Sequence, residues 1–221
     1  MPLTGVLTSE FRRVPGTARR FCTRVLAPCK RGLGRLVLVA SHPQDFTPEP
    51  ECWLHADLEV APSPIAHLGL FARAAIPAGT VVSRLGGRLV SGAQLDALFA
   101  DAAQRPDQPY IDTISVGEDL HLVLPPRQLN HFGNHSCDPN LWWVDAYTLA
   151  ARRPITAGEE VTSDYGTSTA VAEFTMPCVC GSPLCRKTVT GRDWQRIDLQ
   201  QRYGDHWIPL LLDRIRHSRR G

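Results

Sequence analysis

Three cysteines crowd together toward the carboxyl end of the chain, at Cys178, Cys180 and Cys185. Gly181 and Pro183 lie between them and turn the chain, so that the three thiolates can face one ion. Thiolates are zinc ligands, and a structural zinc takes four of them. The spacing therefore predicts a zinc site whose fourth ligand comes from elsewhere. The alternative is a cysteine-rich turn that holds no metal.

Three other stretches carry residues suited to chemistry. Residues 134–140 read Asn-His-Ser-Cys-Asp-Pro-Asn, residues 158–165 read Gly-Glu-Glu-Val-Thr-Ser-Asp-Tyr, and residues 68–72 read Leu-Gly-Leu-Phe-Ala. Each has an ordinary explanation when taken alone: a glycine before a strand usually makes a turn, and an Asp-Tyr pair can be a strand end with a packed aromatic ring. Their order and spacing, together with the cysteine triad, make a specific pattern.

This pattern resembles the SET-domain protein lysine methyltransferases, of bacterial type and with a post-SET zinc segment. The resemblance extends over roughly residues 55–190. It implies a mainly β, β-rich α+β structure, the SET-domain β-clip fold of short sheets. It also implies a knot-like crossing, in which the segment of Asn134 and His135 passes beneath the chain that ends in Asp164-Tyr165.

The resemblance also implies roles for individual residues. Tyr165 matches the catalytic tyrosine, whose hydroxyl orients the substrate amine and the transferring methyl group. Cys137 matches the fourth zinc ligand, beside Cys178, Cys180 and Cys185. The remaining matches line the site of the methyl donor, S-adenosylmethionine: Leu68, Gly69, Leu70, Asn134 and His135.

Several positions depart from the family pattern. His67 stands where many members have a second glycine, which puts the affinity for the cofactor in question. His131 replaces a common arginine, and Ser163 replaces an aromatic residue that governs how many methyl groups are added. The aromatic residues that could complete a lysine cage instead are Trp142, Trp143 and Tyr110, although consecutive tryptophans are more often core packing.

The elements that must position these residues follow from patterning. Short apolar runs at 58–60, 80–82 and 120–124 between prolines and glycines predict β-strands. Residues 93–103 predict one helix capped by Ser91, with Leu95, Leu98 and Phe99 on one face. Amphipathic helices, interrupted near Gly204 and Pro209, are expected after Gly191.

We expect four parts. They are a basic N-terminal extension at 1–54 with a short strand or helix near 33–40, a SET domain at 55–166, a post-SET zinc segment at 174–190 and a C-terminal helical tail at 191–221.

Composition sets broader limits. The chain has 221 residues and a net charge of +2, with no apolar run near the about 18 residues that cross a membrane. Residues 1–50 and 191–221 are basic, whereas the centre is acidic and could attract a lysine-bearing segment. Neither basic end carries a nucleic-acid motif, so no nucleic-acid partner is expected.

The seven cysteines leave one over from any closed set of disulfides, and a reducing, cytoplasmic location is expected. Cys22, Cys29 and Cys52 are expected to be free thiols.

The function indicated is transfer of a methyl group from S-adenosylmethionine to a lysine side chain of a protein or peptide. The 22 arginines and two lysines indicate a GC-rich bacterial genome. Because a bacterium need not contain a histone tail, the identity of the protein substrate stays open. The alternative is a catalytically weak or inactive SET-like, zinc-stabilised module that binds a partner. Retention of Asn134, His135 and Tyr165 favours the enzyme, whereas His67 and Ser163 favour the module. A methyltransferase acting on another substrate is a weaker third possibility.

Overall fold

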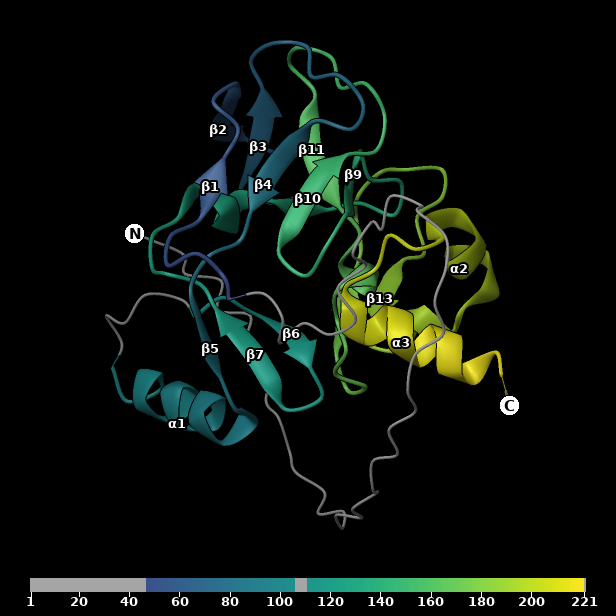
Figure 1. Cartoon of the computed structure of the whole chain (residues 1–221). Helices are drawn as coiled ribbons and strands as arrows, with labels where there is room; N and C mark the ends of the chain where they lie inside the picture. The colour runs from purple at the N-terminus through teal and green to yellow at the C-terminus, as the bar shows by residue number, and fades with distance from the viewer. Residues whose placement is uncertain (1–46, 106–110, 221) are drawn as a thin grey trace, which may run out of the picture. The chain divides into compact units, whose positions relative to one another are not determined.

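The computed structural model describes residues 47–105 and 111–220, all of which belong to one unit of the chain, residues 42–221 (Figure 1). The predicted strand or helix near 33–40, Cys22, Cys29 and Tyr110 lie outside the described residues. The described residues form short β-strands and few helices, so the predicted β-rich class is confirmed. None of their helices has the length and apolar character needed to cross a membrane.

One four-stranded sheet contains the segments whose residues are suited to chemistry. Its order is β2 (Leu58–Pro62), β3 (Leu68–Ala72), β11 (Glu160–Ser163) and β8 (Asn134–His135). β3 pairs antiparallel with β2 and β11, whereas β8 and β11 run parallel. The strand that leads to Tyr165 therefore lies between the glycine-containing strand and the Asn-His strand.

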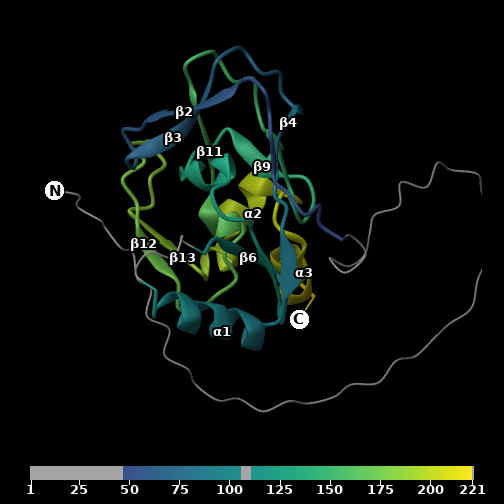
Figure 2. The same ribbon diagram turned by 90° about the vertical axis from the view of Figure 1, so that its left-hand side faces the viewer.

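The described residues form three further sheets. The first, in order β1-β4-β10-β9, pairs its strands antiparallel, and so does the three-stranded sheet β5-β7-β6 (Figure 1). β12 and β13 form an antiparallel pair (Figure 2). The bounds are β1 (Trp53–Leu54), β4 (Val81–Arg84), β10 (Thr148–Ala151), β9 (Leu141–Trp143), β5 (Arg88–Val90), β7 (Leu120–Val123), β6 (Thr113–Gly117), β12 (Thr175–Pro177) and β13 (Thr188–Thr190).

The predicted central helix is confirmed as α1 (Gly92–Ala102). Ser91 accepts a hydrogen bond from the Gln94 amide while the Gln94 side chain accepts one from the Ser91 amide, which makes a capping box. Leu95 is buried, but Phe99, expected on the same apolar face, is 39% exposed. Short 3₁₀ turns occur at η2 (Leu129–Phe132), η3 (Tyr165–Thr167) and η4 (Asp193–Gln195).

The predicted C-terminal helices are α2 (Ile197–Tyr203) and α3 (Pro209–Ser218). Gly204 ends the first at φ 55°, in the left-handed region that glycine tolerates, and Pro209 starts the second. Their buried side chains belong to the same apolar cluster as strands β2, β3, β4, β9, β10 and β11: Leu199, Tyr203, Leu210, Leu211 and Ile215. The C-terminal segment is therefore part of the main core rather than a solvated tail.

This shared core gives a direct test. Leu211 is fully buried in α3, so Leu211→Ala should lower the free energy of unfolding by about 2–5 kcal/mol through lost burial and a cavity. Ile197→Ala removes an apolar side chain that is 62% exposed and should change it by less than about 0.5 kcal/mol. Urea denaturation of both variants measures the difference, and equal effects would contradict the packing described.

Candidate functional site

The parallel pairing of β8 with β11 brings two distant motifs into contact. Asn134 lies beside Thr162, His135 lies beside Ser163, and the Ser136 amide donates to the Ser163 carbonyl at 3.0 Å. Because Tyr165 follows β11 directly, this register sets it against the Asn-His strand. The resemblance implied this neighbourhood, and the structure has it.

Tyr165 is held through both its side chain and its backbone. Its hydroxyl donates to the Gly133 carbonyl at 2.8 Å, and its backbone amide donates to His135 Nδ1 at 3.1 Å. The ring lies 5.4 Å from the His135 ring, centroid to centroid. The hydroxyl proton is directed at Gly133, and the oxygen of such a hydroxyl can still accept hydrogen bonds.

His135 is buried and neutral. Burial lowers its pKa to about 4, although the nearby Asp164 carboxylate opposes the shift. Nδ1 accepts from the Tyr165 amide, so the ring proton lies on Nε2, which is 3.4 Å from Cys137 Sγ. The 3.6 Å approach of Nδ1 to the Asp164 carboxylate is therefore a close contact and not an ion pair. His135 joins the tyrosine to the cysteines.

Among the residues expected at the methyl donor, Leu68, Gly69 and Asn134 lie close together around Glu160. Leu68 is exposed and offers its carbonyl to Asn134 Nδ2 at 3.0 Å, whereas the Leu70 side chain is buried in the core. A Cβ added at Gly69 would lie 2.2 Å from Glu160 Oε1 and 3.0 Å from Asn134 Nδ2, so a side chain there would have to displace the Glu160 carboxylate. The Leu68 carbonyl and the Glu160 carboxylate both accept from Asn134 Nδ2, so these oxygen atoms fix the orientation of that amide.

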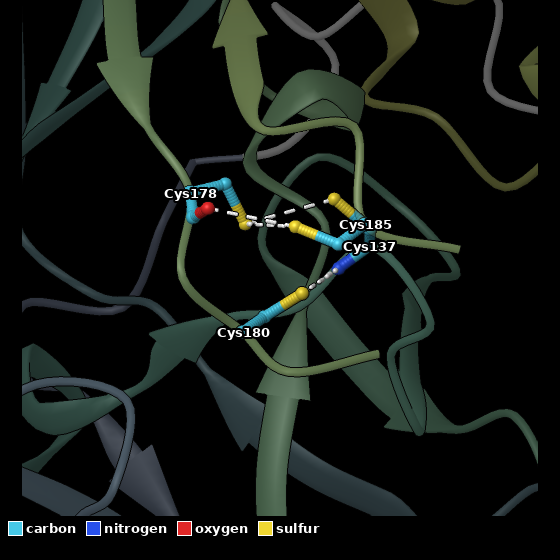
Figure 3. A group of neighbouring side chains, drawn as sticks. All are labelled: Cys137, Cys178, Cys180 and Cys185. Carbon is cyan, nitrogen blue, oxygen red and sulfur yellow. Dashed lines mark hydrogen bonds between the residues drawn. The ribbon is translucent and has the colours of Figure 1, made fainter. Parts of the chain in front are cut away.

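The four predicted zinc ligands converge (Figure 3). The sulfur atoms of Cys137, Cys178, Cys180 and Cys185 all lie within 4.8 Å of one another. Cys178 Sγ is 3.7 Å from Cys137 Sγ and 3.6 Å from Cys185 Sγ. A tetrahedral zinc with Zn–S bonds of about 2.3 Å separates its sulfurs by about 3.8 Å. The residues therefore fit a tetrahedral metal ion.

Backbone amides donate to the sulfur atoms of Cys137 and Cys180, although burial still raises the pKa of the Cys137 thiol. The Arg186 amide donates to Cys137 Sγ at 3.3 Å, and the Cys137 amide donates to Cys180 Sγ at 3.4 Å. Burial alone would raise the pKa of the Cys180 thiol, but amide hydrogen bonds from Cys137 and Ser182 outweigh it and lower the pKa to about 7. Burial raises the pKa of the Cys178 thiol, so a cation beside its sulfur would be needed to stabilise a thiolate there.

A buried ion pair fastens the cysteine segment to the chain between β11 and Tyr165. Arg186 donates from Nη1 and Nη2 to the two carboxylate oxygens of Asp164, both at 2.7 Å, and from Nε to Asp193 at 3.1 Å. The Tyr203 hydroxyl of α2 donates to Asp164 Oδ2 at 2.8 Å. Burial works against the charge on Arg186, yet its hydrogen bonds to Asp164 hold the pKa of the guanidinium above its usual value. Three segments therefore meet at one carboxylate.

Other expected residues lie away from this arrangement. Trp143 is buried in the core, as the packing alternative predicted, and Trp142 stacks on His206 with centroids 3.3 Å apart. Neither tryptophan is placed to cage a lysine. His67 is exposed with φ 38°, in a backbone region that favours glycine. His131 faces Asp112 at 3.4 Å in place of the expected arginine.

Comparison with known proteins agrees with this geometry. The family model described as "SET domain" matches residues 67–166. Residues 67–166 form a SET domain. The SET domain contains β3, β8, β11, Cys137 and Tyr165, whereas Cys178, Cys180 and Cys185 lie beyond the match.

Relatives of the chain carry methyltransferase names. A "Histone-lysine N-methyltransferase, H3 lysine-4 specific" of Mycosarcoma maydis is 35% identical over 59% of this chain and 9% of its own length. A "Probable histone-lysine N-methyltransferase set-23" of Caenorhabditis elegans is 29% identical over 54% of each chain. The methyltransferase domain of human "Histone-lysine N-methyltransferase SETMAR" is 22% identical, with TM-score 0.48, over 62% of this chain and 58% of its own. The chain thus spans only part of these proteins.

Sequence reasoning missed several residues that hold the site together. Arg186 follows Cys185 directly but has no motif of its own, and Ser63, Asp193 and Tyr203 lie outside every motif. Asp164 and Glu160 belong to the stretch 158–165 that ends at Tyr165, and this membership is the feature of the sequence that could have indicated them.

The hydrogen bond from Tyr203 to Asp164 can be tested without changing the packing. Tyr203→Phe keeps the ring and removes the hydroxyl, so a buried carboxylate oxygen loses a donor. We expect the free energy of unfolding at neutral pH to fall by about 1–3 kcal/mol, measured by urea denaturation.

Alkaline pH supplies a second signature of the same bond. Burial raises the pKa of Tyr203, so above about pH 10 the unfolded chain releases a proton that the native chain keeps. The native protein should therefore lose stability there by about 1.4 kcal/mol per pH unit from this group. Tyr203→Phe lacks this component, and a variant with the same alkaline slope as the native protein would contradict the assignment.

Proposed function

We propose that the chain is an S-adenosylmethionine-dependent protein lysine methyltransferase with a structural zinc site. The observation that carries this proposal is the position of Tyr165 inside the SET match, with its hydroxyl bound to the Gly133 carbonyl and its amide bound to His135. The methyltransferase names of the relatives support the same reaction, and lysine is the residue class that their printed names give.

S-adenosylmethionine supplies an electrophilic methyl group when bound. The chain's own residues have to hold a lysine amine in line with it and keep that amine neutral. Tyr165 presents its oxygen as an acceptor for an amine hydrogen, because its own proton is given to Gly133. A desolvated channel lowers the pKa of the lysine, and His135, itself neutral, adds no positive charge beneath the tyrosine.

The four cysteines would hold zinc through their sulfur atoms. The ion would neutralise thiolate charge and fix the post-SET segment, residues 174–190, against the strand that carries Tyr165. The separations of the sulfur atoms and the amide donors around them support zinc over a metal-free turn.

A second candidate is a SET-like module that binds a partner without turnover. His67 at φ 38° and Ser163 before Asp164 are the observations that favour it. The intact contacts of Tyr165, His135 and Asn134 favour the enzyme. A protein substrate with an exposed lysine, a bacterial source and a cytoplasmic location stay predictions from the sequence.

Tyr165→Phe separates the two candidates. Removing the hydroxyl should lower turnover by roughly ten- to a thousandfold, since one well-placed hydrogen bond lost in the transition state is worth a few kcal/mol. Zinc content and cofactor affinity should stay near those of the native protein. Activity of the native protein should rise with pH, because a free lysine amine loses its proton only near pH 10.4.

The assay is transfer of label from S-adenosylmethionine to a bacterial lysate, followed by mapping of the labelled residue by mass spectrometry. A modified lysine supports the proposal. A Tyr165→Phe protein with native turnover on the mapped substrate would refute the catalytic role. Cofactor binding with no labelled protein in any lysate would favour the module.

Metal content tests the zinc site. The purified protein should hold one zinc per chain, and Cys180→Ser should lower that content because it removes one of four ligands. Cys52→Ser is the matched control, because Cys52 is a free, half-buried thiol outside the cluster. The assignment would be wrong if the native protein held no zinc, or if Cys180→Ser left the zinc content unchanged.

A further inference from the structure

The side chain of Asn134 has a fixed orientation. Its Nδ2 lies 2.7 Å from Glu160 Oε1, 3.0 Å from the Leu68 carbonyl and 3.1 Å from Ser63 Oγ. A carboxylate and a carbonyl can only accept hydrogen bonds, so the amide nitrogen must face them and Oδ1 must face away. Within residues 47–105 and 111–220, no hydrogen bond is made to this Oδ1.

Glu160 is itself held in place. The Ser63 hydroxyl lies 2.8 Å and 3.0 Å from its two carboxylate oxygens, and Ser63 Oγ in turn accepts from the amides of Ile65 and Ala66. The carboxylate occupies the space that a side chain at Gly69 would take, 2.2 Å from a Cβ placed there. The glycine therefore makes room for a protein carboxylate, which adds to the role that the sequence suggested for it.

A carboxylate bound to the nitrogen end of an amide polarises that amide. Electron density shifts toward Oδ1 of Asn134, which becomes a stronger acceptor, and most of all for a cationic donor. S-adenosylmethionine carries such a donor in the amino group of its methionine part, while its adenine and ribose offer only neutral donors.

We propose that Glu160 is a positioning residue, whose carboxylate orients and polarises the Asn134 amide so that Oδ1 accepts a hydrogen bond from the cofactor's amino group. This inference rests on the proposed function, because it requires the cofactor to bind beside Asn134. Glu160 touches no reacting atom and acts through Asn134 alone.

The test compares two ligands in two proteins. The ligands are S-adenosylhomocysteine and its analogue without the α-amino group, and the proteins are native and Glu160→Gln, which keeps the shape and removes the charge. Dissociation constants come from calorimetry or competition. Glu160→Gln should raise the dissociation constant of S-adenosylhomocysteine about tenfold. It should change that of the deamino analogue by less than about twofold, because only the first ligand uses the polarised oxygen.

Controls separate positioning from general damage. Glu59→Gln makes the same charge change at an exposed position on β2 and should leave both affinities unchanged. Zinc content and melting temperature are measured for every variant. If Glu160→Gln does not fold, Ser63→Ala carries the same comparison, since it removes the hydroxyl bound to the carboxylate.

The outcomes are distinct. Selective loss of S-adenosylhomocysteine binding supports the role of Glu160. Equal weakening of both ligands, or no weakening of either, overturns it while the proposed function stands. Native protein that binds neither ligand refutes the proposed function itself.

Discussion

The bidentate ion pair between Asp164 and Arg186 is the contact on which the rest of the site depends. Both side chains are buried, with exposures of 0% and 5%, so neither charge can be balanced by water. A buried carboxylate left without its partner costs about 3–5 kcal/mol, which is a large part of the stability of a small domain. Because Asp164 precedes Tyr165 and Arg186 follows Cys185, this pair ties the cysteine segment to the chain that leads from β11 to Tyr165. The Tyr203 hydroxyl brings α2 to the same carboxylate.

The consequence is that three neighbouring functions share one scaffold. β11 carries Glu160 toward the cofactor side, and the chain beyond it carries Asp164 toward the cysteines and Tyr165 toward His135. His135 contacts both Tyr165 and Cys137, so the residues suited to methyl transfer and those suited to metal binding lie on one continuous chain of hydrogen bonds. A metal ion at the cysteines would therefore influence the position of Tyr165 through His135.

Patterning along the chain predicted the elements that depend on local chemistry. The Ser91 cap, the breaks at Gly204 and Pro209 and the convergence of Cys178, Cys180 and Cys185 follow from residue type and spacing, and each is confirmed. The convergence of Cys137 on them came only through the family resemblance. The Arg186–Asp164 pair could not be predicted, because an arginine beside a cysteine has no pattern that names a partner 22 residues away. The same applies to Glu160, whose contact with Asn134 depends on a parallel strand register that only tertiary structure sets.

Hydrogen exchange of Arg186→Met tests most directly whether this ion pair orders β11 and the chain that follows it to Tyr165. Methionine keeps length and apolar character but leaves Asp164 without its cation. Amides of residues 160–167 should exchange faster than in the native protein, together with residues 174–190. Residues 113–123 of the β6–β7 hairpin, which lie outside the network, should keep their protection and serve as the internal reference. Faster exchange confined to residues 174–190, with residues 160–167 as protected as in the native protein, would contradict the account.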